Sequence, residues 1–251
     1  MNLETELEKI SERFPAMDAE FFKRVWNSDL DKFKKRLEAI EFTRKEKVLD
    51  AGFGMGQWAV ELSKLNKEVY GIEYAQNRVD AVNEIVKLYN VKNTKFIQGS
   101  IEELPYEDNV FDAVFCYGVI FCTDYKKSLK EFYRVLKPGG KLYFSANGLG
   151  WSLYCIIEQH NKSESYDPRF YAIENINNTL NYCENNKFTH GFQVIIDRNS
   201  LHATLKSLGF TNTIINHEGG INLVSPGTDL SFYKMKEYQG QDFIFEVLCQ
   251  K

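Results

Sequence analysis

The sequence predicts an α/β fold of three layers, in which a mostly parallel sheet of seven strands is covered by helices on both faces. Short apolar segments alternate with amphipathic segments between residues 47 and 146, a pattern typical of repeated strand–helix units. Three glycines at positions 52, 54 and 56 follow the first apolar segment. The last two strand-like segments are joined by a long glycine-containing link without a helical pattern, which predicts an antiparallel last strand.

Each element follows from its own pattern of apolar residues. Residues 1–45 carry aromatic and aliphatic residues at helical spacing among many charges, which predicts an N-terminal helical cap. Residues 46–251 are predicted to form the main domain, with the aromatic and asparagine-rich segment 148–192 as a lid or insertion after the fifth strand. The predicted strands are 47–51, 68–72, 95–98, 111–117, 141–146, 211–216 and 243–249, and helices are predicted at 57–65, 77–89, 125–136 and 199–208.

Composition and charge exclude several classes of protein. With 43% hydrophobic and 26% charged residues, the 251-residue chain resembles an ordinary soluble globular protein. The net charge of -4 is spread among interleaved acids and bases, which disfavours a nucleic-acid substrate. No apolar run approaches the roughly 18 to 20 residues of a spanning helix, and the start lacks a signal-peptide pattern, so we expect a cytoplasmic protein without membrane contact.

The cysteines favour neither disulfides nor a metal site. Their number is odd, and they form no Cys-x-x-Cys pair, so a reduced state without bound metal is expected. The five are Cys116, Cys122, Cys155, Cys183 and Cys249.

The glycine turn predicts a ligand site at the end of the first strand. An apolar strand, a tight glycine turn and a helix from Gln57 form a crevice at the strand's carboxyl end. The same turn also occurs where a strand only packs against a helix. Asp50 precedes the glycines, and an anion there repels a pyrophosphate but attracts a sulfonium or ammonium group. Because Gly56 follows Gly54 by two positions and not three, the spacing also disfavours a dinucleotide site.

The ends of later strands add polar groups to this crevice. Glu73 ends the second strand, about 20 residues beyond the turn, where a carboxylate can accept hydrogen bonds from a ribose diol. The alternative role of Glu73 is an acid at the start of the next helix. Ser100 follows the third strand, where it suits either adenine recognition or a helix cap with Glu103. The segments Phe111–Gly118 and Arg134–Gly140 supply a fourth strand end and a helix stop.

These five ordered motifs resemble class I S-adenosylmethionine-dependent methyltransferases, particularly the small-molecule branch with the ubiquinone and menaquinone biosynthesis enzymes. The resemblance covers about residues 45 to 147 and implies a Rossmann-like fold, S-adenosylmethionine as cofactor and S-adenosylhomocysteine as product. It places the methionine part at the glycine turn, the ribose at Glu73 and the adenine at the turn 99–101. The implied cofactor residues are Asp50, Ala51, Gly52, Gly54, Gly56, Trp58, Glu73, Tyr74, Arg78, Ser100, Ile101, Glu102, Cys116 and Tyr117.

Two departures from the family pattern concern the site itself. An aspartate is common where this chain has Ser100, so adenine recognition there relies on backbone amides or on Glu102. Many relatives have a histidine near Phe121 or Cys122, and its absence leaves the catalytic base unassigned.

Candidates for the acceptor side come from the strand ends and the insertion. Tyr117 and His190 are the candidate catalytic residues, although a lone histidine is more often a surface residue. Phe14 and Trp26 are candidates to close the opposite side. The candidate substrate-binding residues are Asn147, Trp151, Tyr154 and Glu158, with His160 nearby; the aromatic ones also suit simple packing of the lid.

The predicted function is transfer of a methyl group to an oxygen or nitrogen atom of a small polar metabolite by in-line displacement. The sequence lacks the motifs of amino-nitrogen base methylases and of cytosine-carbon methylases. One alternative is an aminopropyltransferase-like enzyme, although Cys116-Tyr117-Gly118 does not supply its acidic acceptor pocket. Another is a non-catalytic protein that binds the donor. We expect a monomer or homodimer of bacterial origin, with a small-molecule acceptor as its partner.

Overall fold

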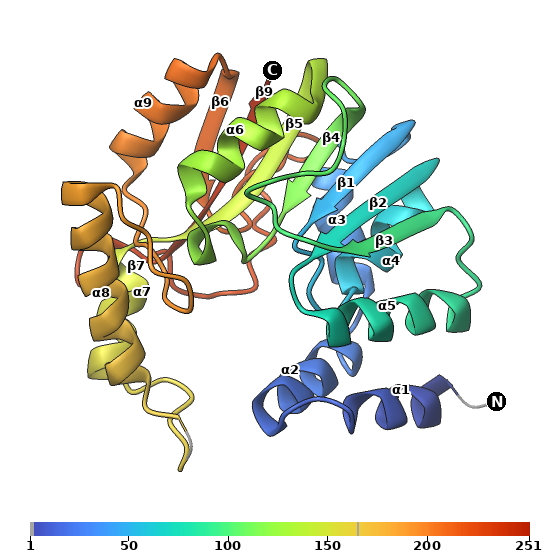
Figure 1. Cartoon of the computed structure of the whole chain (residues 1–251), viewed down its shortest axis with the longest axis horizontal. Coiled ribbons are helices and arrows are strands. Elements are labelled where there is room, and N and C mark those ends of the chain that lie inside the picture. The colour runs from blue at the N-terminus through green and yellow to red at the C-terminus, as the bar shows by residue number, and fades with distance from the viewer. Residues whose placement is uncertain (1–2, 165) are drawn as a thin grey trace.

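The sheet has the order β3-β2-β1-β4-β5-β9-β6 and confirms the predicted fold class. The computed structural model describes residues 3–164 and 166–251, and Figure 1 shows the sheet between its helices. Strand β9 runs antiparallel to both of its neighbours, as predicted for the last strand, whereas the pairs from β3 through β5 are parallel. The strands of this sheet are β1 (Lys47–Ala51), β2 (Glu68–Glu73), β3 (Thr94–Gln98), β4 (Phe111–Cys116), β5 (Leu136–Asn147), β6 (Thr211–His217) and β9 (Ile244–Gln250).

Two apolar clusters hold the layers together, one on each face of the sheet. The first joins β1 and β4 to the N-terminal helices, and the second joins the opposite face to the later helices. The helices of the first face are α1 (Leu3–Ser11), α2 (Ala16–Trp26), α3 (Asp31–Ala39), α4 (Gln57–Leu65) and α5 (Gln76–Leu88). The second face is covered by α6 (Tyr125–Val135) and α9 (Arg198–Leu208), and a short 3-10 turn, η1 (Ile120–Cys122), precedes α6.

The N-terminal helices share the core of the sheet. Phe22, Phe33 and Leu37 are almost fully buried in the cluster that also contains α4 and α5. The indole nitrogen of Trp26 donates a hydrogen bond of 3.1 Å to the carbonyl of Met55, inside the glycine turn. Packing of their apolar stripes therefore places α2 and α3 beside the end of β1.

The asparagine-rich insertion forms helices that its sequence does not reveal. It contains α7 (Leu149–Ile157) and α8 (Pro168–Asn185), with Asp167 as N-cap and Asn186 as a left-handed C-cap. Buried Asn178 accepts a hydrogen bond of 2.9 Å from the Thr189 amide and donates to carbonyls of the following loop. Amide side chains thus pair with loop backbone, so tertiary contacts override a low helix propensity.

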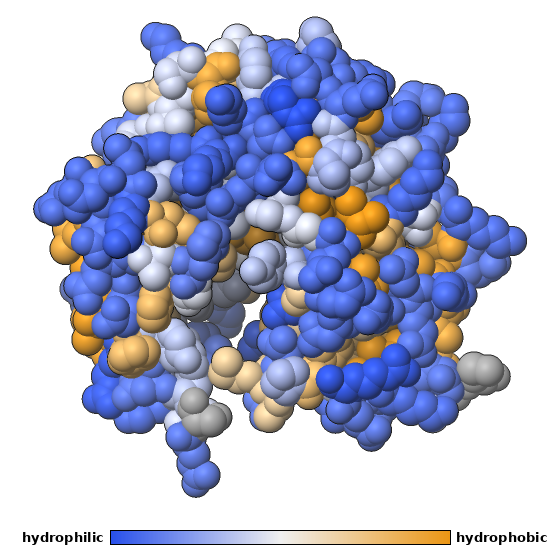
Figure 2. Space-filling model, in the orientation of Figure 1, coloured by the Kyte–Doolittle hydropathy of each residue, from blue (hydrophilic) through white to orange (hydrophobic). Residues whose placement is uncertain are grey.

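The carboxyl ends of the parallel strands meet at one edge of the sheet, between the N-terminal helices and the insertion. Figure 2 shows a hollow between the part of the surface formed by α7 and α8 and the part formed by α2. A small hairpin of β7 (Glu237–Tyr238) and β8 (Gln241–Asp242) lies in the link before β9 and packs on α7. No helix in residues 3–164 or 166–251 is long and apolar enough to cross a membrane.

Candidate functional site

The glycine turn leaves open space at the end of β1. Gly54 and Gly56 both have left-handed backbone, with φ of 54° and 84°. A Cβ atom added at Gly56 would lie 2.6 Å from the side chain of Val82, whereas one added at Gly54 meets no atom within 4 Å. Gly56 therefore allows close packing against α5, while the backbone at Gly54 borders space that a ligand can occupy.

Glu73 lies directly beside this turn, as its position in the sequence predicts. Its Oε2 accepts a hydrogen bond of 3.1 Å from the amide of Gly54, and its Oε1 accepts one of 3.1 Å from the amide of Ala75. The guanidinium of Arg78 is 3.9 Å from Oε1 and also pairs with Asp18 of α2 at 3.0 Å. Two backbone amides thus fix the orientation of a buried carboxylate at the crevice.

Asp50 carries the clearest sign of a missing cationic partner. It is 1% exposed, and its Oδ2 has no hydrogen-bond partner among the described residues. Burial, and secondarily the negative charge of Glu73, raise the pKa of Asp50 well above its ordinary value. An unpartnered buried acid is costly unless a donor or cation arrives. The nearby Gln57 Oε1 and Trp58 Nε1 also lack partners within the described part of the chain.

The other predicted cofactor residues are distributed more widely around the crevice. The hydroxyl of Ser100 accepts a hydrogen bond of 3.1 Å from the Glu102 amide, and Glu102 in turn accepts one of 3.0 Å from the Asp124 amide. Tyr74 is 79% exposed, and Ile101 is buried. Burial, and then the charge of Asp50, raise the pKa of the Cys116 thiol.

Trp58 lies in an aromatic cluster under the crevice. Its ring is 3% exposed and contacts the rings of Phe33, Phe115 and Tyr117 at centroid distances of 4.8, 4.8 and 5.0 Å. These contacts pack Trp58 directly against Tyr117, and its predicted role in cofactor binding stays a prediction.

The insertion holds the predicted acceptor residues beside the end of β5. Asn147 is buried and donates a hydrogen bond of 3.1 Å to the side chain of Gln193. The Gln193 amide donates one of 2.7 Å to the side chain of Asn175, so a chain of amides leads from the strand end into the insertion. This chain of amides ends at a cavity of about 220 Å³ between α7 and α8. None of the described residues that line this cavity is charged: they are Trp151, Ser152, Cys155, Tyr166, Pro168, Tyr171, Ala172, Asn175, Gly191 and Gln193.

The aromatic candidates of the insertion pack against one another. Trp151 contacts Tyr154 and His160 at 6.2 and 5.6 Å, and burial, with a smaller effect of Arg24, lowers the pKa of His160. Glu158 accepts a hydrogen bond of 2.7 Å from Tyr238 of the small hairpin. These residues brace α7, and the half-buried Trp151 is the one that also reaches the cavity.

The two catalytic candidates occur in different surroundings. Tyr117, at the end of β4, donates a hydrogen bond of 2.9 Å to Oε1 of Glu218. His190 is exposed, and its ring contacts Phe188 at 5.0 Å. The structure therefore ties Tyr117 to a buried acid, while His190 lies in the loop after α8.

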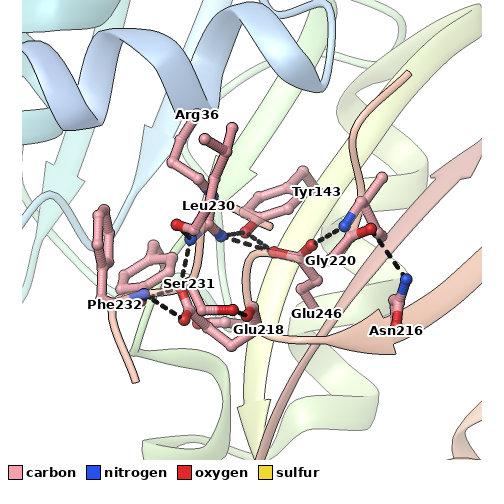
Figure 3. A network of polar contacts seen from close by, with 12 residues as sticks. Arg36, Tyr143, Asn216, Glu218, Gly220, Leu230, Ser231, Phe232 and Glu246 are labelled. Atoms are coloured by element: carbon pink, nitrogen blue, oxygen red, sulfur yellow. Dashed lines mark hydrogen bonds and ion pairs between the residues drawn. The ribbon is translucent and has the colours of Figure 1, made fainter. Parts of the chain in front are cut away.

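A buried charge network surrounds that acid and joins four parts of the chain (Figure 3). Arg36 of α3 donates to Glu218, and it donates to Glu246 of β9 and to the Tyr143 hydroxyl of β5 at 2.6 and 2.7 Å. Arg36, Glu218 and Glu246 are each at most 2% exposed. Sequence analysis missed all three, because an arginine within a charged helix and an acid before two glycines give no sign of burial.

Comparisons with known proteins find a family match for the part of the chain that includes the glycine turn. Residues 49–144 match a family described as "Methyltransferase domain". A demethylmenaquinone methyltransferase of Listeria monocytogenes is 41% identical over 71 residues, which are 28% of this chain and 30% of that protein. A ubiquinone/menaquinone biosynthesis C-methyltransferase of Haemophilus ducreyi is 49% identical over 53 residues, or 21% of this chain and 20% of that protein. The aligned segments thus span about a third or less of these relatives.

Solved structures match over nearly the whole chain. A putative sarcosine dimethylglycine methyltransferase from Galdieria sulphuraria has a TM-score of 0.61 at 16% identity, over 92% of this chain and 97% of that one. A possible histamine N-methyltransferase from Thermotoga maritima has a TM-score of 0.54 at 18% identity, over 97% and 99% of the two chains. At these identities the likeness concerns the fold alone.

Proposed function

We propose that this chain transfers a methyl group from S-adenosylmethionine to an oxygen or nitrogen atom of a small polar metabolite. The proposal is supported by the match of residues 49–144 to a methyltransferase domain and by the similarity to S-adenosylmethionine-dependent methyltransferases. The family match confirms the resemblance predicted from the sequence, with S-adenosylmethionine as the cofactor. The observation that carries the proposal is the unpartnered, buried carboxylate of Asp50 beside Glu73 and the open backbone of Gly54.

The residues present fit this cofactor. Asp50 and Glu73 place two carboxyl groups at the crevice, and a donor that carries a sulfonium and an ammonium group favours their ionised forms. In this proposal Asp50 accepts hydrogen bonds from the amino-acid part and Glu73 from the ribose diol, while Gly54 permits close approach of the backbone; the unpartnered Asp50 oxygen and the open space at Gly54 support these roles. When bound, the donor supplies an electrophilic methyl carbon. The protein's own contribution is to align the acceptor, exclude water and receive a proton.

The acceptor side supports a small, polar molecule that lacks a strong charge. The cavity between α7 and α8 has uncharged walls, and amide groups line its way to the end of β5. Both curated relatives bear names of quinone-pathway methyltransferases, and one name specifies methylation at carbon. Carbon is therefore the second candidate for the acceptor atom. The two solved relatives bear names of enzymes that act on nitrogen compounds.

The alternatives have less support. An aminopropyltransferase needs acidic side chains after β4 to hold its amine acceptor, and this chain has Cys116, Tyr117 and Gly118 there. A protein that only binds the donor needs no acceptor site, whereas a cavity and a hollow lie beside the strand ends here.

The test is transfer of tritium from S-adenosyl-[methyl-³H]methionine to a panel of small phenols, catechols, amines and quinols. Product mass should rise by one methyl group, and fragmentation should place that group on oxygen or nitrogen. Methylation at ring carbon would move the assignment to the second candidate. Binding of the donor without transfer to any class of acceptor would favour the non-catalytic alternative.

A further inference from the structure

The Tyr117 hydroxyl has its single hydrogen committed to Glu218. The bond from Tyr117 Oη to Glu218 Oε1 is 2.9 Å long, and an ionised carboxylate can only accept. Burial, and then the negative charge of Glu218, raise the pKa of Tyr117 well above its ordinary value, so the hydroxyl keeps its proton at neutral pH. The Tyr117 oxygen can therefore form a further hydrogen bond only as an acceptor, through its lone pairs.

Glu218 is itself held in place from several directions. Its Oε1 also accepts from Arg36, and its Oε2 accepts a hydrogen bond of 2.9 Å from the Phe232 amide. Arg36 cannot turn away, because Tyr143 and Glu246 hold its second nitrogen. Figure 3 shows these groups converging from the helix, the strands and the 218–232 link. The carboxylate thus has a fixed position before any acceptor arrives.

The network borders the acceptor side of the sheet. Tyr117 follows β4 and precedes Gly118, which is exposed and has open space where a side chain would lie. On the other side, Phe232 leads to the partly exposed Tyr233, whose ring contacts Trp151 at 6.2 Å. Hydrogen bonds of Glu218 thus connect Tyr117, after β4, with residue 232, whose neighbour Tyr233 contacts Trp151 of the cavity wall.

We propose that Glu218 is a positioning residue, which orients Tyr117 as a hydrogen-bond acceptor for the O–H or N–H group that is methylated. This rests on the proposed function. As the acceptor atom bonds to the methyl carbon, the carbon–sulfur bond breaks and its electron pair stays on sulfur. The acceptor's proton passes to Tyr117 Oη, and the hydrogen of Tyr117 passes to Oε1 of Glu218. Tyr117 remains a neutral phenol throughout, and after transfer the proton returns from the buried Glu218 to Tyr117 Oη, while partly exposed Tyr117 passes a proton to solvent.

This arrangement selects acceptors by chemistry. A nucleophile that carries a removable proton gains a hydrogen bond and a route for that proton, whereas a tertiary amine or thioether gains neither. The chemical class of the acceptor is therefore an uncharged compound with a removable proton on oxygen or nitrogen, such as a phenol, an alcohol or an imidazole.

The first test needs no acceptor and no turnover. Tyrosine labelled with ¹³C at Cζ is incorporated into full-length protein bound to S-adenosylhomocysteine, and the Tyr117 resonance is identified by its loss in Tyr117→Phe. Glu218→Gln should shift this resonance, because an amide is a weaker acceptor than a carboxylate. The matched variant Tyr143→Phe removes another hydroxyl from the same network and should leave the Tyr117 resonance in place. A Tyr117 resonance at the same chemical shift in wild-type protein and in Glu218→Gln would overturn the proposal.

The second test compares transfer rates with catechol, 4-hydroxybenzyl alcohol and imidazole as probes. Glu218→Gln should lower kcat by roughly 10²-fold at neutral pH with an unchanged donor Kd, and its rate should rise about tenfold per pH unit as the probe ionises by itself. Tyr143→Phe should keep the wild-type pH profile. Equal losses in both variants with parallel pH profiles would assign Glu218 a structural role only. If wild-type protein fails to bind S-adenosylhomocysteine, the proposed function is wrong. If it binds this compound but methylates no probe, the shift of the Tyr117 resonance in Glu218→Gln tests the proposal.

Discussion

The buried arginine offers the sharpest test of how this fold is stabilised. Arg36 is 2% exposed and donates to two acids that are themselves buried, Glu218 and Glu246. Arg36→Met keeps the apolar stem but leaves both carboxylates without their cation. Breaking a buried pair from one side costs about 3 to 5 kcal/mol. At about 2 to 4 °C per kcal/mol for a chain of this size, Tm should fall by about 6 to 20 °C.

The pH dependence of this loss identifies its cause. Burial raises the pKa of Glu246 although Arg36 opposes the shift, so removal of Arg36 should raise that pKa further. A carboxyl with a raised pKa in the folded state contributes stability below its unfolded pKa of about 4.3 and loses that contribution as pH rises through the folded value. Destabilisation by Arg36→Met should therefore be smallest near pH 4.5 and should grow toward pH 7.

Urea unfolding, followed by circular dichroism from pH 4.5 to pH 8, measures the loss of stability in Arg36→Met at each pH. The control is Lys35→Met on the same helix, where an exposed lysine pairs with exposed Asp31 at 2.8 Å and little change in Tm is expected. A loss for Arg36→Met no larger than that of the control, or one independent of pH, would refute the reasoning.

Three further predictions concern the crevice and the insertion. Asp50→Asn should weaken S-adenosylmethionine binding at least tenfold, as measured by calorimetry. In wild-type protein the affinity should fall as pH drops through the raised pKa of Asp50. An affinity that does not depend on pH would contradict the proposed role of Asp50. Gly54→Ala should cost about 1 to 2 kcal/mol of backbone strain and abolish donor binding. Gly56→Ala should lower Tm more, because its Cβ atom would clash with Val82. Normal donor binding by Gly54→Ala would argue against the open crevice. Asn178→Ala should lower the free energy of unfolding by about 1 to 3 kcal/mol, measured with denaturant, and leave the donor Kd unchanged. If the 189–193 loop keeps its protease resistance in this variant, the hydrogen bonds of Asn178 do not hold the loop in place.

The sheet was predictable because its signals are local. Parallel strands such as β1 and β4 are short apolar runs between turns, and Glu73 falls at the end of β2. The glycine spacing disfavoured a dinucleotide, and the charge of Asp50 favoured a cationic ligand. The structure places these residues together, with the amide of Gly54 bonded to Glu73.

The acceptor side was less predictable because its contacts are distant in sequence. The bond between Tyr117 and Glu218 spans 101 positions, and Arg36 is 182 positions from Glu218. Helix α8 has a sequence poor in apolar periodicity, and its stability comes from side-chain amides that bond a loop. Nothing in a linear pattern shows which acids a fold will bury.

Titration calorimetry of S-adenosylmethionine and S-adenosylhomocysteine against the wild-type protein and Glu73→Ala tests the central claim most directly. The account predicts one molecule of either compound bound per wild-type chain, and binding at least tenfold weaker in Glu73→Ala, because the carboxylate beside Gly54 is lost. Absence of binding by the wild-type chain, or equal affinities of the two proteins, would contradict it.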